Sequence, residues 1–278
     1  MKKLITFFFV VAICVSCTEK NDYKTIKSAL STDGAVSLEQ IEVVRQTIIE
    51  TKGLTSEQVS DLQMALSDYI LACAEQEAAK FETAFQQVYS HWSDASEMSW
   101  KIDSLDNAME QLHRYGIQMY RSEGNIESSV SPLFVAEPFW FYLTKAEQEL
   151  VKMQQVEFDR PSLEDEGLAI SYQEVSDRLA KYDALCVEFA TDSNYSAFES
   201  MRLFYLSLLI FGVDNSQVFD WDTEVLNPEV KATIFNHIAE HPYTRSSNEL
   251  KQFMDILKKS KYKKTEQSDI FVTGTLKN

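Results

Sequence analysis

The sequence predicts an all-α protein, in which antiparallel helical hairpins form a bundle or a short superhelical array of about eight helices. Apolar residues recur at steps of three and four along most of the 278-residue chain, which is the spacing of one helix face. Patterns typical of helix starts precede several of these runs. Only 7 Gly and 5 Pro are present, too few for the turns of a β-sandwich, barrel or propeller.

The N-terminal half of the sequence contains three expected helices. Capping boxes, in which Ser or Thr is followed three residues later by Glu or Gln, stand at 37–40 and 55–58. The first helix ends at Gly53, and the second carries apolar residues on one face as far as Val88. A third helix is expected near Leu105–Tyr120.

In the C-terminal half, apolar steps of four and three predict one continuous helix from Phe139 to Met153. Further starts are expected at capping boxes and at one Asn-Pro pair: 171–174, 196–199, 246–249 and Asn227-Pro228. The run from Leu203 to Phe211 is apolar on every side except at Ser207. It should therefore be a central helix that is buried all round.

The polar, proline-containing stretch Ser122–Pro138 is the expected seam between two parts of the chain, although a single domain fits the sequence equally well. The last residues predict a tail that is either frayed or strand-like. The expected parts are a signal peptide (1–16), a flexible tether (17–36), an N-terminal helical part (37–121), a C-terminal helical part (122–264) and a tail (265–278).

The N-terminus has the layout of a secretory signal peptide. Lys2 and Lys3 precede the apolar run Leu4–Val15, which is too short for a mature transmembrane helix of about 20 residues. Small Ser16 directly precedes Cys17. This layout resembles the lipobox of bacterial lipoproteins, in which the signal peptide is removed before a cysteine that carries acyl chains.

The resemblance implies that Cys17 is lipidated and that its lipid anchors the protein to a membrane. In that family, Thr18 in place of Asp implies sorting to the outer membrane, on either its periplasmic or its surface side. The sequence departs from the family at Cys14, where Leu is usual. The alternative is an ordinary signal peptide, cleaved near Ser16, which leaves Cys17 as a free thiol.

Charge excludes one class of partner. The chain has 43 Asp and Glu against 26 Lys and Arg, a formal net charge of −17. Nucleic acids repel such a surface, because their binding depends on cations that displace condensed counterions. A lysine-rich run at 258–264 stands against this acidic background. It either contacts anionic lipid or stabilises the C-terminus of a helix through the helix dipole.

The C-terminal third contains a candidate internal repeat. Segment 187–208 aligns with 236–257 at an offset of 49 residues and superimposes Phe204 on Phe253. Segment 239–246 resembles the turn of tetratricopeptide-type helical hairpins, a resemblance that implies a solenoid-like stack. The alternative is that two unrelated amphipathic hairpins align by chance.

The metal and catalytic motifs lack required partners. His237 and His241 match the inverted zinc-protease pattern H-x-x-E-H, but Pro242 disfavours helical geometry at the second histidine and no third ligand is evident. Glu110 and His113 match the Glu-x-x-His motif of di-iron bundles, which need that motif twice. We therefore expect no metal, no cofactor and no catalytic residue.

Two cysteines remain in the expected mature body, Cys73 and Cys186. Export to an oxidising compartment would permit a disulfide between them. Both, however, lie on the apolar stripes of their expected helices, where cysteine commonly packs as a small hydrophobic residue. We predict that they are unpaired.

Aromatic residues beyond those needed between helices gather at Phe139–Tyr142 and around Trp221. Such clusters are typical of protein-interface hot spots. The alternative is packing, because a helix that is buried between two layers is apolar all round. The favoured hypothesis is a non-enzymatic helical interaction module that binds another macromolecule, with Trp140, Tyr142 and Trp221 as its binding surface.

Two alternatives use the same regions of the sequence. The first is a glycan-binding lipoprotein, in which one of these three rings stacks on a sugar. The second is a hydrolase of envelope polymer that uses a carboxylate pair such as Asp220 and Asp222. The expected partners are thus a membrane, through the N-terminal lipid, and a protein or a glycan.

Overall fold

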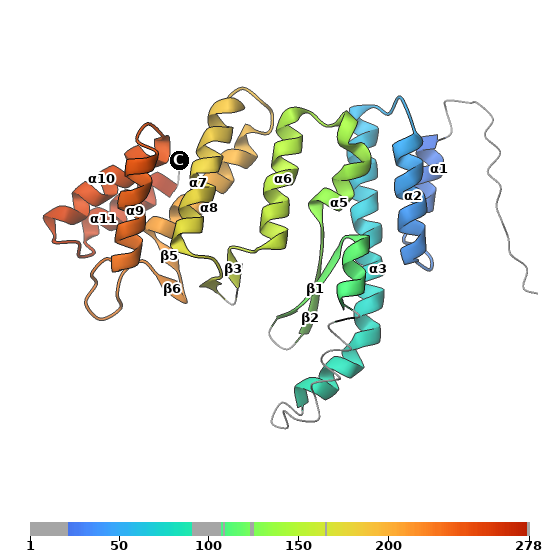
Figure 1. Ribbon diagram of the computed structural model, residues 1–278, viewed down its shortest axis with the longest axis horizontal. Coiled ribbons are helices and arrows are strands. Elements are labelled where there is room, and N and C mark those ends of the chain that lie inside the picture. The colour runs from blue at the N-terminus through green and yellow to red at the C-terminus, as the bar shows by residue number, and fades with distance from the viewer. Residues whose placement is uncertain (1–21, 91–106, 108, 123–124, 165, 277–278) are drawn as a thin grey trace, which may run out of the picture.

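The computed structural model describes residues 22–90, 107, 109–122, 125–164 and 166–276. The chain is predominantly helical, which confirms the predicted all-α class. Its helices stand side by side in a row that broadly follows the sequence, with the N-terminal helices at one end and the C-terminal helices at the other (Figure 1).

The helices of the first half are α1 (Asp22–Ala29), α2 (Leu38–Glu50), α3 (Ser56–Ser90), the 3-10 helix η1 (His113–Tyr115), α5 (Pro132–Ala136) and the 3-10 helix η2 (Glu137–Tyr142). Those of the second half are α6 (Lys145–Asp159), α7 (Tyr172–Glu188), α8 (Tyr195–Ile210), α9 (Pro228–Glu240), α10 (Arg245–Lys259) and α11 (Glu266–Leu276). Short antiparallel hairpins join β1 (Ile117–Ser122) to β2 (Asn125–Val130), β3 (Leu163–Glu164) to β4 (Gly167–Leu168), and β5 (Gly212–Val213) to β6 (Ser216–Gln217).

Most predicted helix starts are confirmed. The Thr55 hydroxyl accepts a hydrogen bond from the Gln58 N–H at 3.2 Å, and the Gln58 side chain accepts one from the Thr55 N–H at 3.0 Å. This reciprocal pair is a capping box. Ser171 and Asn227 also cap their helices, each by accepting a bond from a first-turn N–H. Helix α2 begins directly after Ser37, as predicted.

Two predicted starts are wrong. Helix α8 begins at Tyr195 after the N-cap residue Asn194, so Ser196 lies inside the helix. Helix α10 begins directly after Thr244, and Ser246 is buried within its first turn. Serine and threonine are frequent in both loops, so the local pattern does not single out the residue that caps.

The helix predicted near Leu105–Tyr120 is wrong at its C-terminal end, which forms strand β1. Gly116 ends η1 with φ 72°, and a Cβ at this position would lie 2.5 Å from the Phe134 ring, so a glycine is required. Beyond it, Ile117 and Met119 are both buried, at the two-residue period of a strand. Helix α3 packs against both strands of the β1–β2 hairpin.

The single helix predicted from Phe139 to Met153 is in fact two helices, η2 and α6. Thr144 begins the second one through a capping box with Glu147. Both helices contact α5, but they belong to different parts of the core. Helix η2 packs on α2 and α3, whereas Ala146 of α6 belongs to the C-terminal core.

Both terminal segments contain helices that the sequence reasoning missed. The expected tether over 17–36 is wrong from residue 22 onward, because Ile26 of α1 is 2% exposed and Lys27 pairs with Asp61 of α3 at 2.6 Å. The expected tail over 265–278 is also wrong, because α11 packs on α8 and α10 and buries Val272. Each helix buries very few apolar residues, too few for a clear helical period.

The buried apolar side chains form two clusters. The N-terminal cluster extends from Ile26 to Phe139, and the C-terminal cluster extends from Ala146 to Val272. The division therefore falls at the start of α6 rather than within Ser122–Pro138. The reason is that β1, β2 and η2 pack on the N-terminal helices.

Cys73 and Cys186 are free and buried, one in each cluster, which confirms that they are unpaired. Burial raises the pKa of the Cys73 thiol to about 11 and that of the Cys186 thiol to about 12. Both thiols therefore remain protonated and pack as small hydrophobic groups.

The C-terminal half contains two consecutive helical hairpins, α7–α8 and α9–α10, and α7 packs against both α8 and α9 (Figure 1). The predicted burial is confirmed for the C-terminal part of α8, where Leu206, Leu209 and Ile210 are fully buried. Leu203 and Phe204 are only half-buried, and Phe211, directly after this helix, is 69% exposed. The internal repeat across these hairpins stays a prediction.

Candidate functional site

The predicted lipidation site Cys17 and the signal peptide lie outside the described residues. Among the described helices, none combines the length and the apolar character needed to cross a membrane. The predicted binding residues Trp140, Tyr142 and Trp221 do lie in the described part, in two separate regions, helix η2 and the loop that leads to α9.

Helix η2 uses most of its aromatic side chains for packing. Phe139 is fully buried, Trp140 is half-buried, and the Tyr142 hydroxyl donates a hydrogen bond to the Thr51 carbonyl oxygen at 3.0 Å. The exposed ring of this helix is instead Phe141, which is 100% exposed. Tyr142 thus packs against the N-terminal cluster, Trp140 lies beneath the Lys152 ammonium group, and neither is brought together with Trp221.

Trp221 is 79% exposed and lines a cavity of about 350 Å³ together with the exposed Phe211. The cavity lies where α8 ends, beside hairpin β5–β6 and the loop that leads to α9. We call it the Phe211–Trp221 cavity. Two large apolar rings exposed at one concave site are typical of a surface that a partner covers.

Gly212 explains why Phe211 is exposed. Its φ is 84°, and a Cβ at this position would lie 2.8 Å from the Ser216 carbonyl oxygen and 3.0 Å from the Val218 nitrogen. Only glycine adopts this backbone without strain and without a clash. Because Gly212 has a left-handed backbone conformation, the chain leaves the axis of α8 here and begins strand β5. Phe211 therefore does not continue the buried face of the helix.

Backbone and side-chain hydrogen bonds fix the loop that carries Trp221. The Asp220 carboxylate accepts bonds from the Thr223 N–H at 2.8 Å and from the Thr223 hydroxyl at 2.6 Å. The Glu224 carbonyl oxygen accepts a bond from the Lys264 N–H at 2.8 Å. The bonds from Thr223 lower the pKa of Asp220, so this carboxylate is ionised at neutral pH and suits an acceptor better than a general acid.

The polar residues that line the cavity are Asp214, Gln217, Asp220, Glu224 and Lys264. Within the described part of the chain, Asp214 and Glu224 form no ion pair, and Lys264 Nζ lies 3.5 Å from Asp269. Asp222, the other member of the predicted carboxylate pair, is exposed and does not line this cavity. The cavity therefore combines several acidic residues, which can accept hydrogen bonds, with the exposed rings of Phe211 and Trp221.

The histidine motifs are not arranged as metal ligands. His237 is buried, with Nδ1 2.8 Å from the Ser176 hydroxyl and Nε2 2.7 Å from the Ser246 hydroxyl. Burial lowers the pKa of His237 to about 4, so the imidazole is neutral. Glu110 and His113 are exposed. Across the described residues, no group of three or more His, Cys, Asp or Glu is placed to hold a metal ion.

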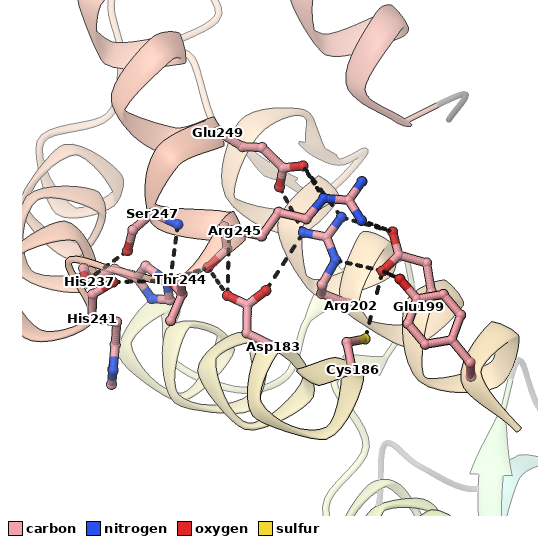
Figure 2. A network of polar contacts seen from close by, with 12 residues as sticks. Asp183, Cys186, Glu199, Arg202, His237, His241, Thr244, Arg245, Ser247 and Glu249 are labelled. Atoms are coloured by element: carbon pink, nitrogen blue, oxygen red, sulfur yellow. Dashed lines mark hydrogen bonds and ion pairs between the residues drawn. The ribbon is translucent and has the colours of Figure 1, made fainter. Parts of the chain in front are cut away.

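A buried ionic network surrounds Arg202 of α8, a side chain with no exposed surface (Figure 2). Its guanidinium lies 2.7 Å from Glu249 of α10, 3.0 Å from Glu199 of its own helix and 3.9 Å from Asp183 of α7. Arg245 pairs with Glu199 at 2.8 Å and with Glu249 at 3.1 Å. The network therefore joins α7 and α8 to α10.

The same network reaches His237. The Ser246 hydroxyl donates to the Asp183 carboxylate and also contacts His237, so the ionic cluster and the buried imidazole share one serine. The sequence pattern does not predict this network, because Arg202 merely precedes an apolar run and two of its three partners, Asp183 and Glu249, are distant in the chain. The expected capping role of Ser246 is replaced by these tertiary hydrogen bonds.

A second cavity, of about 530 Å³, lies beside this network and is lined by Tyr243, Arg202, Glu199 and Arg245, among others. Its charged groups are already paired with one another, so a ligand would have to displace those pairs. The Phe211–Trp221 cavity is therefore the better candidate for ligand binding.

No protein-family model, curated protein or solved structure matches this chain. The fold and the site together define a class: a predominantly helical protein with a rigid aromatic cavity at the end of a buried helix.

Proposed function

We propose that the protein is an envelope-anchored lipoprotein that acts as a non-enzymatic helical binding module for another macromolecule, which it contacts through the Phe211–Trp221 cavity. One observation carries the proposal: two large rings are exposed at one cavity whose backbone is held by Gly212 and by the Asp220–Thr223 turn.

The energetics favour such a contact. Covering one aromatic ring removes apolar surface from water and contributes about 1.5–3 kcal/mol. Because the supporting loop and hairpin are already ordered, little conformational entropy is lost when a partner binds. Aromatic anchors in preformed sites are also the residues that dominate interface energies.

Helix α1, which follows the proposed anchor in the sequence, and the cavity lie toward opposite ends of the row of helices (Figure 1). Cys17 precedes the first residue of α1, Asp22, by only a few residues, each of which spans at most about 3.6 Å. Helix α1 stands at one end of the row of helices, whereas α8, hairpin β5–β6 and α9 lie toward the other end (Figure 1). A lipid on Cys17 would hold α1 near the membrane and leave the cavity accessible to a partner.

The same geometry gives little support to the hydrolase hypothesis. Asp220 is occupied as an acceptor in a turn, and Asp222 does not line the cavity. A glycosidase needs two carboxyl groups that face one substrate, with one of them protonated.

Photo-crosslinking in intact cells tests the proposal. The photoreactive residue p-benzoylphenylalanine replaces Phe211 in one strain and Phe141 in a control strain, since Phe141 is at least as accessible but lies on η2. We expect a defined adduct from position 211 and none from position 141. Absence of an adduct at 211, or equal adducts at both positions, would contradict the proposed function.

A further inference from the structure

We propose that the ligand of the Phe211–Trp221 cavity is a neutral glycan, whose sugar rings stack on the two aromatic faces. The inference rests on the proposed function and names its ligand class.

The exposed rings provide the first half of the recognition. A pyranose presents a face of C–H groups that packs on a flat aromatic ring, and tryptophan offers the largest such face. Trp221 and Phe211 are both mostly exposed and line the same cavity. The cavity volume of about 350 Å³ lies near the lower end of the range for ligand sites, which suits a short stretch of sugar units.

The polar residues that line the cavity would recognise the hydroxyl groups of the sugar. Sugar hydroxyls are hydrogen-bond donors, and the carboxylates of Asp214, Asp220 and Glu224 are acceptors beside the rings. The Gln217 amide both donates and accepts. Asp220 is held in place by Thr223, so it needs no reorganisation when a hydroxyl approaches.

Charge argues against a membrane surface as the occupant. The exposed lysines at 258, 259, 261 and 263 precede the cavity residue Lys264 in the sequence, and the run would attract anionic lipid. Yet three carboxylates line the cavity itself, and they would repel lipid phosphates from the rings. An uncharged polyol meets no such repulsion.

Affinity electrophoresis of the full-length protein in non-ionic detergent tests the inference. Native gels contain no polysaccharide, or one of hydroxyethylcellulose, mannan, xylan, pullulan or galactan. We expect at least one polysaccharide to retard the wild-type protein. Phe211→Ala and Trp221→Ala should each weaken the affinity about tenfold or more, whereas Phe141→Ala should not.

A conservative variant and a folding control keep the result interpretable. Trp221→Phe retains an aromatic face and should keep part of the retardation that Trp221→Ala loses. Unchanged circular dichroism spectra for all variants would show that the fold is intact. Retardation that survives both alanine substitutions would overturn the assignment of the glycan to this cavity.

The remaining outcomes separate the inference from the proposed function. If no polysaccharide retards the protein but crosslinking from position 211 yields a peptide adduct, the partner is a protein and only the glycan inference fails. Cosedimentation with anionic phospholipid vesicles that depends on Trp221, without retardation in any gel, would likewise overturn it. If neither gels nor crosslinks respond, both proposals fail.

Discussion

Arg202 Nη1 lies 2.7 Å from Glu249 Oε2, so an ion pair with a fully buried arginine joins α8 to α10. Glu199 and Asp183 complete the surroundings of this guanidinium, and the Ser246 hydroxyl extends the network to His237. Groups in such a network depend on one another, because removal of one charge leaves its partners desolvated.

Arg202→Met should therefore reduce the free energy of unfolding by about 3–5 kcal/mol, because three carboxylates would lose their buried counter-charge. Chemical denaturation measures the change. Lys145→Ala is the matched control, since the Lys145–Glu188 pair is exposed and screened by water. Equal losses in the two variants would show that the buried network has no special role.

Gly212→Ala should destabilise the protein by about 1–3 kcal/mol, because alanine at φ 84° is strained and its Cβ would meet the backbone of Ser216 and Val218. The strained variant should also lose ligand affinity through displacement of Phe211. Thermal unfolding measures the stability. Gly34→Ala, at a site with no heavy atom within 4 Å, should leave the midpoint nearly unchanged, and similar effects at both glycines would refute this role.

Acidification should remove stability that depends on His237. Burial, and secondly the charge of His241, lower the pKa of His237 from 6.5 to about 4 in the folded protein. Between these values the unfolded chain binds more protons, so the free energy of unfolding falls as the pH drops from about 6.5 to about 4. At about 1.4 kcal/mol per pKa unit, the loss reaches roughly 3 kcal/mol.

Comparison with His237→Gln isolates this contribution from the carboxylates that titrate in the same range. The stability of the variant relative to the wild type should improve as the pH falls from 7 to 4. Denaturation curves at several pH values give both free energies. A constant difference across this range would mean that His237 is protonated equally in the folded and unfolded states.

Cys17→Ser should abolish membrane anchoring, because serine cannot carry the thioether-linked lipid that the N-terminal layout predicts. The variant should accumulate as an unprocessed or a soluble protein. Fractionation of cells and intact mass measure the outcome. Recovery of the variant in membranes at its mature size would contradict lipidation at this residue.

Local signals predicted much of the fold. The starts of α3, α7 and α9 depend on Thr55, Ser171 and Asn227, each of which acts within one helical turn. The end of the predicted helix near Tyr120 was wrong because its pairing partner, β2, lies beyond a turn. The missed helices α1 and α11 depend on docking rather than on their own periodicity.

In the candidate site, too, local sequence features predicted some residues, and tertiary contacts determined the exposure of the others. Trp221 was predicted from its polar loop, a local property of the sequence. Phe211 was expected in a buried helix, and its exposure follows from the left-handed backbone at Gly212. Trp140 and Tyr142 were predicted as part of a binding surface, with packing between helices as the alternative, and both are half-buried in the structure.

Hydroxyl-radical footprinting of the native chain tests the central claim, binding at the Phe211–Trp221 cavity, most directly. Oxidation is compared between intact cells, where a partner is present, and the purified protein. Phe141 and Tyr243, which are 100% and 97% exposed, serve as internal references. We expect oxidation of Phe211 and Trp221 to fall several-fold in cells relative to both references. Equal oxidation in cells and in the purified protein would contradict the account.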